Sequence, residues 1–134
     1  MKNFELNQDM VNIRGQFYPT GHIVAMFPGE EALRAAVRSL VDAGVPEDEM
    51  SLITPEVMMR DIVRTVGSAD IPLPSPGTEA DTVRRFSDLA SNGHFALLIH
   101  VSRDHDSDRI MEALRGHMPS HAQYYRRLVI EDLA

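Results

Sequence analysis

The residues of this chain best suited to metal binding or proton transfer are its six histidines. The chain has 134 residues and no cysteine. Two of the histidines, His22 and His94, each open an apolar stretch that is typical of a buried strand. On neighbouring parallel strands, the two imidazoles would lie side by side and could bind a metal ion or share a proton. The alternative is structural: each imidazole caps the start of its strand and bonds a nearby carbonyl.

A second group of metal-ligating side chains begins near the end of the second apolar stretch. His100 is followed by a loop that contains Asp104 and His105. Ligands of α/β proteins often bind beyond the carboxyl ends of strands, so these three residues, with Asp106 and Asp108, are candidate ligands of a divalent cation. The alternative is that Asp104 or Asp106 is the N-cap of the following helix and that Asp108 lies in its first turn. The spacing matches no fixed metal motif such as an EF-hand, and we predict no definite metal or cofactor.

Other catalytic and binding motifs are missing from the sequence. The turn from Phe27 to Glu31 places carboxylates where a phosphate-binding loop needs bare backbone N–H groups. No serine lies in a nucleophile elbow, and the lack of cysteine excludes disulfides, thiolate metal sites and cysteine nucleophiles. The formal net charge of −7 disfavours nucleic-acid binding. Since the chain shows neither a signal peptide nor a membrane-spanning run, we expect a cytoplasmic protein without membrane partners.

The periodicity of the apolar residues predicts two βαβ units with two helices between them. Gly44 is placed to end the first helix, and Thr54-Pro55 is a typical helix opening. We expect residues 1–21 to form an irregular arm, with a short element around Asp9 to Ile13, and residues 22–134 to form a single domain. The predicted strands are 22–27, 50–54, 94–102 and 122–129, and the predicted helices are 30–43, 55–66, 79–92 and 106–117.

Two βαβ units in succession predict an α+β, ferredoxin-like fold with a four-stranded sheet, here with two extra helices inserted between the units. A weak internal duplication agrees with this, since His22 aligns with His94 and Pro46 with Pro119. We expect the first strands of the two units to form a central, parallel pair. Both strands are apolar on each face, which predicts that both faces of the sheet are covered.

The inserted helices are expected to cover part of the second face, and a homodimer to complete the cover. The last strand supports a dimer, because Tyr124, Tyr125, Arg126 and Arg127 are residue types enriched in protein interfaces. An amphipathic edge strand with one tyrosine packed inward is the alternative.

The segment from His22 to Thr54 resembles the opening of bacterial general-stress (heat-induced stress) domains. In both, a strand, an Ala-rich helix, a glycine and an acidic turn lead into a second strand. The resemblance covers about a quarter of the chain and only the N-terminal βαβ unit. It implies a ferredoxin-like unit from a stress-associated family, and it implies no catalytic residues.

Three hypotheses for the function follow. The first is a non-enzymatic stress-related domain that acts by oligomerisation or by binding a protein or small ligand. The second is a small enzyme or metal-binding module that uses the strand-end histidines. The third, by analogy of fold alone, is a metabolite-sensing regulatory domain.

Overall fold

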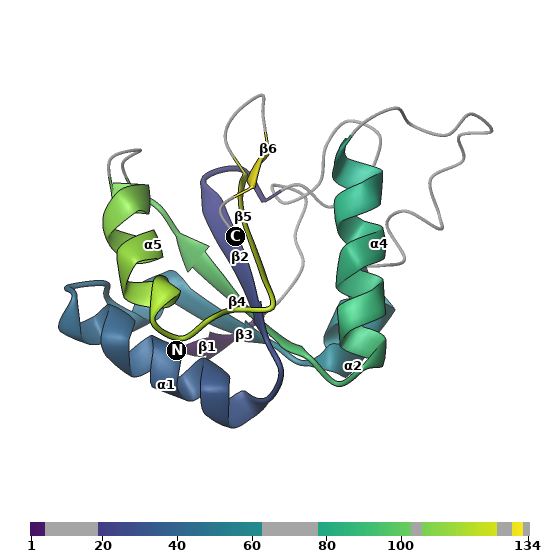
Figure 1. Cartoon of the computed structure of the whole chain (residues 1–134), viewed down its shortest axis with the longest axis horizontal. Coiled ribbons are helices and arrows are strands. Elements are labelled where there is room, and N and C mark those ends of the chain that lie inside the picture. The colour runs from purple at the N-terminus through teal and green to yellow at the C-terminus, as the bar shows by residue number, and fades with distance from the viewer. Residues whose placement is uncertain (5–18, 63–77, 103–105, 126–129, 133–134) are drawn as a thin grey trace.

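The described part of the chain folds into one six-stranded sheet with helices on both faces (Figure 1). The computed structural model describes residues 1–4, 19–62, 78–102, 106–125 and 130–132. The strands are β1 (Lys2–Asn3), β2 (His22–Phe27), β3 (Met50–Ile53), β4 (Phe95–His100), β5 (His121–Tyr125) and β6 (Ile130–Asp132). The helices are α1 (Glu30–Asp42), the 3-10 turn η2 (Glu47–Glu49), α2 (Pro55–Val57), the π-helical η3 (Met58–Ile62), α4 (Thr78–Ser91) and α5 (Asp106–Arg115).

The α+β class and the two predicted βαβ units are confirmed, and the strand order is β1-β3-β4-β2-β5-β6. The four predicted strands form the antiparallel centre of the sheet, β3-β4-β2-β5. Two short strands that the sequence did not indicate extend it. β1 lies in the segment predicted to be an irregular arm and pairs parallel with β3, while β6 pairs with β5. The short element predicted around Asp9 to Ile13 lies outside the described residues.

The predicted parallel pairing of the two central strands is wrong. β2 and β4 are neighbours, but they run antiparallel, with Ile23 opposite Ile99 and Phe27 opposite Phe95. The physical reason is that each βαβ crossover leaves a gap one strand wide, and the gap is filled by a strand of the other unit. β2 and β3 therefore run in the same direction with the antiparallel β4 between them.

Glycines in the left-handed region end two of the helices. Gly44 (φ +98°) follows α1 and Gly93 (φ +83°) follows α4. In both places the residue after the glycine donates its N–H to a carbonyl five residues back, from Val45 to Leu40 at 2.9 Å and from His94 to Leu89 at 3.1 Å. This is the Schellman arrangement, which favours glycine because a side chain is strained there. The predicted helix stop at Gly44 is confirmed.

The helix opening at Thr54-Pro55 is also confirmed, since Thr54 Oγ1 accepts a hydrogen bond from Val57 N at 3.2 Å. The predicted helix over 55–66 forms as α2 and η3 up to Ile62, and its last residues lie outside the described part.

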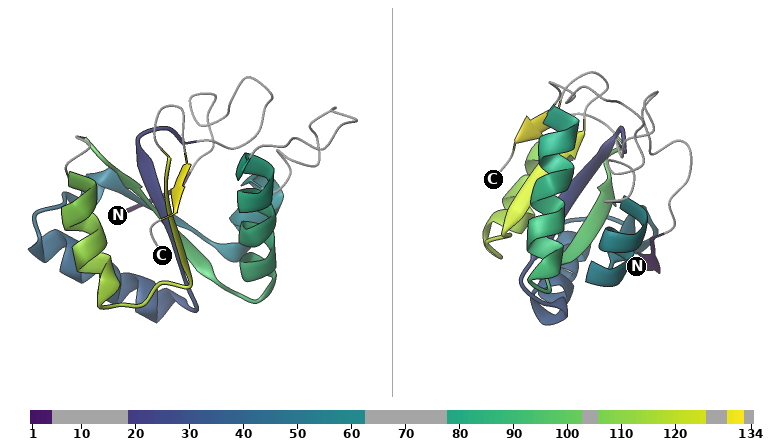
Figure 2. Two further views of the ribbon diagram at one scale, coloured as in Figure 1. Left: turned by 45° about the horizontal axis from the view of Figure 1, so that its top comes forward. Right: turned by 90° about the vertical axis from the view of Figure 1, so that its right-hand side faces the viewer.

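Both faces of the sheet are buried by helices of the same chain. One face carries Ile23, Ala25 and Phe27 and packs against α1 and α5. The opposite face, called the second face below, carries Val24 and Met26 and packs against α2, η3 and α4 (Figure 2). Its helix side chains are Met58, Ile62, Phe86 and Ala90, all buried.

The burial of both sheet faces by helices of the same chain removes one reason for predicting a dimer. Tyr124 and Tyr125, which suggested an interface, are 2% and 0% exposed within one chain. Arg126 and Arg127 lie outside the described residues. The dimer stays a prediction, but the need to cover an apolar face of the sheet is no longer a reason for it. Among the described helices, none is long and apolar enough to cross a membrane.

The substitution Phe86→Ala tests how much the second-face helices contribute to stability. Phe86 is fully buried and packs edge-on against the ring of His121, with 5.8 Å between ring centroids. Its truncation removes apolar contact and leaves a cavity, so we expect a loss of about 3–5 kcal/mol in the free energy of unfolding. Urea denaturation measures this, with the exposed neighbour Arg85→Ala as control. Equal stability of the two variants would show that α4 does not anchor the sheet.

Candidate functional site

The antiparallel register brings together two histidines that the sequence pattern did not pair. His22, the first residue of β2, lies opposite His100, the last residue of β4. Glu49 precedes Met50, which is opposite Ile99, so the carboxylate of Glu49 reaches His100. On the other side His22 is opposite Tyr125. These residues form a polar row across the second face, and the three that can carry charge are called the histidine row below: Glu49, His100 and His22.

The predicted pairing of His22 with His94 is wrong for the same reason as the parallel pairing. In an antiparallel pair, the start of one strand meets the end of the other. His94 precedes Phe95, which is opposite Phe27, so His94 lies at the far end of the two strands. Its Nδ1 is buried and has no hydrogen-bond partner in the described part of the chain.

The predicted aspartate-rich cluster divides into two parts. Asp104 and His105 lie outside the described residues. Asp106 and Asp108 occupy the first turn of α5, and Asp106 lies 3.5 Å from Arg109. Asp108 therefore lies in the first turn of the helix, as the structural alternative predicts, whereas Asp106 is the first helical residue and not the N-cap.

Each imidazole of the histidine row is held through its Nδ1 atom. His100 Nδ1 lies 2.5 Å from Glu49 Oε2, and His22 Nδ1 lies 3.1 Å from the carbonyl oxygen of Thr20. A carboxylate and a carbonyl oxygen can only accept hydrogen bonds, so Nδ1 is the donor in both rings. In the neutral form of each ring, Nε2 then carries the lone pair.

The two rings are close enough to act together. Their centroids are 5.1 Å apart and their planes are tilted by 55°. An imidazole nitrogen binds Zn²⁺ at about 2.0–2.1 Å, and two imidazoles on one tetrahedral ion have centroids roughly 5 Å apart. The observed separation of the rings therefore suits a shared metal ion. Among the described residues, no group of three or more His, Asp or Glu side chains converges on one point.

Burial favours the neutral form of His22. The pKa of His22 is lowered from its ordinary value of 6.5, chiefly by desolvation and also by the neighbouring His100. Hydrogen bonds to the carbonyls of Thr20 and Pro19 and the charge of Glu49 oppose this shift without cancelling it. His100 is more accessible, with 45% of its side chain exposed. The row thus joins a partly buried imidazole to an exposed one.

A second pair of chemically active side chains joins α1 to the end of α5. Ser39 Oγ and His117 Nε2 are 2.7 Å apart, beside a groove of about 580 Å³ that Asp42, Arg109 and Glu112 also line. Ser39 lies inside α1, where the nearby N–H groups belong to helical hydrogen bonds and cannot form an oxyanion hole. The pair therefore links two helices rather than forming a nucleophilic site.

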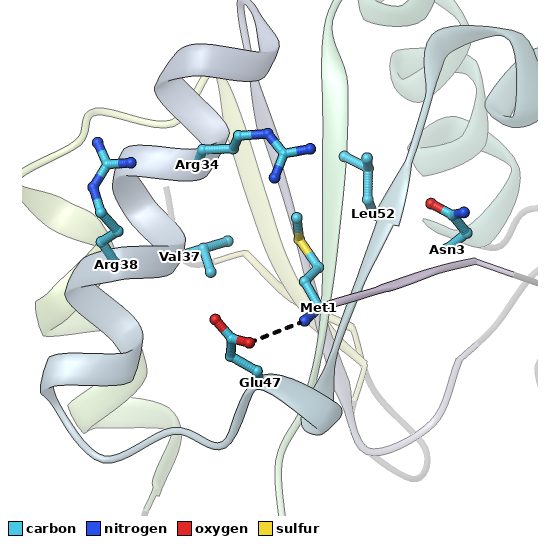
Figure 3. A pocket seen from close by; sticks show the side chains of 7 residues that line it. All are labelled: Met1, Asn3, Arg34, Val37, Arg38, Glu47 and Leu52. Atoms are coloured by element: carbon cyan, nitrogen blue, oxygen red, sulfur yellow. Dashed lines mark ion pairs between the residues drawn. The ribbon is translucent and has the colours of Figure 1, made fainter.

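Figure 3 shows a third location, a pocket of about 380 Å³ between α1, the edge strand β1 and its neighbour β3. Arg34 and Arg38 line it and suggest an anion site. However, Arg34 already pairs with Glu30 at 2.7 Å, and the α-amino group of Met1 lies 3.5 Å from Glu47, which also lines the pocket. These carboxylates offset much of the positive charge.

The sequence pointed to His22 and His100, but it did not show that they pair. It also did not show the contact of Glu49 with His100 or that of Ser39 with His117. Glu49 stands directly before a strand, in a position that resembles any acidic turn residue. Only the register shows that it faces His100.

The shifted pKa of His22 predicts a pH dependence of stability. A histidine whose pKa is lower in the folded state takes up its proton more readily after unfolding. Folding stability is therefore lost as the pH falls below about 6.5 toward the lower folded pKa. His22→Asn keeps a donor near Nδ1 but does not titrate, so the difference in unfolding free energy between wild type and variant should change across this range. Chemical denaturation at pH 8, 6 and 5 measures it. A constant difference would contradict the assigned shift.

No family model matches the chain, and no curated protein and no solved structure shows significant similarity to it.

Proposed function

We propose that this chain is a ferredoxin-like domain that acts by binding rather than by catalysis, and that its ligand is a late first-row divalent metal ion. The ion is held by Nε2 of His22 and Nε2 of His100. The main support for this proposal is that Nδ1 of each ring donates a hydrogen bond within the chain, which leaves Nε2 as the metal-binding atom. Histidines that bind metals usually donate their other N–H to a carboxylate or a backbone carbonyl, as these two do to Glu49 and Thr20.

The choice of metal follows from the chemistry of the donors. Two imidazoles suit Zn²⁺, Cu²⁺ or Ni²⁺, whereas Ca²⁺ and Mg²⁺ prefer several oxygen ligands. The nearby carboxylate of Glu49 adds negative charge that favours a cation. The low pKa of His22 keeps its lone pair available near neutral pH.

The strand arrangement supports the ferredoxin-like assignment. In the central order β3-β4-β2-β5, each βαβ unit encloses one strand of the other. This interleaving of two split βαβ units is typical of that fold. The inserted helices α2, η3 and α4 would then be an addition that covers the face usually left open.

The remaining parts of the proposal rest on the sequence. The resemblance of residues 22–54 to general-stress domains supports a stress-related role, and the net charge of −7 argues against nucleic-acid partners. A cytoplasmic location is part of the same proposal. A binding role is favoured over an enzymatic one because catalytic zinc sites usually have three protein ligands, whereas two histidines converge here.

Calorimetric titration of the full chain with Zn²⁺ and Ni²⁺ tests the proposal. We expect saturable binding that His100→Ala weakens about tenfold or more, because one of two ligands is lost. His94→Ala is the matched control, since it removes a histidine from the opposite end of β4 and should leave the affinity unchanged. Absence of binding, or equal losses in both variants, would refute a site at His22 and His100.

The carboxylate that holds His100 gives a second prediction. Glu49→Gln removes the charge on the acceptor, so it should weaken metal binding about 10- to 100-fold while both ligands remain. Asp48→Asn is a suitable control, because it removes the same charge from the adjacent exposed residue. The two dissociation constants are compared at one ionic strength. If both variants bind alike, Glu49 acts only through its overall charge.

A further inference from the structure

We propose that a second copy of this chain completes the metal site, so that one ion joins two chains through His22 and His100 of each. This inference rests on the proposed metal binding and goes beyond it. The partner is identified by the chemistry of the site, which has two imidazole ligands where a closed zinc site has four.

The metal site is incomplete within the described part of one chain. No third His, Asp or Glu converges with the two imidazoles there. Glu49 is engaged at Nδ1 of His100, on the side of the ring away from Nε2. Tyr125, the next residue of the row, is fully buried. The two open positions of a tetrahedral ion must therefore be filled from outside these residues.

A symmetric dimer would complete the metal site with the same two residues from each chain. A two-fold axis through the ion brings the same two side chains from an identical copy, which produces a four-histidine site without any further ligand type. Two-fold dimers are the commonest assemblies of identical chains, and each surface patch in them faces its own copy. The exposed side of the row suits this, since the His100 side chain is 45% exposed and the Glu49 side chain 30%.

Association of the two chains should depend on the metal ion. Each chain has a formal net charge of −7, and two Glu49 carboxylates would lie near the contact, so two metal-free chains repel one another. A divalent cation offsets this repulsion locally. Apolar driving force is small, because both sheet faces are covered and the large exposed apolar residues of the described part are the scattered Val41, Met59 and Met118.

The experiment measures mass and metal content together. The full chain at micromolar concentration is analysed by light scattering after size exclusion, without metal, with Zn²⁺, and with Zn²⁺ followed by EDTA. We expect a monomer, a dimer of twice the mass that contains one ion per two chains, and a return to monomer.

Variants separate this inference from the metal site itself. His100→Ala should abolish the zinc-dependent dimer, and His94→Ala should retain it. Because His22 is partly buried, His22→Ala is compared only after circular dichroism shows that it is folded, and the exposed His100 carries the test in either case.

Each other outcome has a definite meaning. A monomer that binds one ion per chain would overturn the bridged dimer and leave the proposed metal binding intact. A dimer that forms without metal, or that persists in His100→Ala, would also overturn it. A chain that binds no zinc would overturn the proposed function itself.

Discussion

The antiparallel pairing of β2 with β4 is the interaction on which the rest of the structure depends. These strands form the centre of the sheet, and each also pairs with the outer strand of the other βαβ unit. Their register decides which side chains share a face and which meet at the strand ends. A shift by one residue would exchange the two faces and bring the polar row into the apolar layer under α1 and α5.

Burial on both faces strengthens this constraint. Ile23 and Phe27 point into one apolar layer while Val24 and Met26 point into the other, so the central strand is packed on both sides. A sheet with one bare face would tolerate polar residues along all of it. On the two central strands the polar residues lie only at the strand ends, and the antiparallel register places His22 and His100 opposite each other.

The geometry of the histidine row follows from backbone positions more than from side-chain freedom. Thr20 belongs to the turn that leads into β2, and Glu49 to the 3-10 turn that leads into β3, so the acceptors for both Nδ1 atoms are set by chain segments that enter the sheet. The Ser39–His117 pair, in contrast, joins the middle of α1 to the turn that follows α5, and it links two segments of the same apolar layer. Supporting contacts like those of the two Nδ1 atoms are what distinguish a prepared ligand site from a chance proximity of polar groups.

The sequence by itself determined the local structure, because the necessary signals lie within a few residues of one another. The spacing of apolar residues, together with Gly44 and Thr54-Pro55, was sufficient to predict the main strands and helices and the burial of both sheet faces. It also marked His22 and His100 as candidate functional residues. Only the tertiary structure decided the direction of the central pairing, the edge strands β1 and β6, and the contact of Glu49 with His100. Most of these depend on contacts between residues about 40 to 100 positions apart, and many registers satisfy local preference equally until both apolar faces are buried at once. The exception is β6, which pairs with β5 over fewer than ten positions, with Tyr125 opposite Ile130.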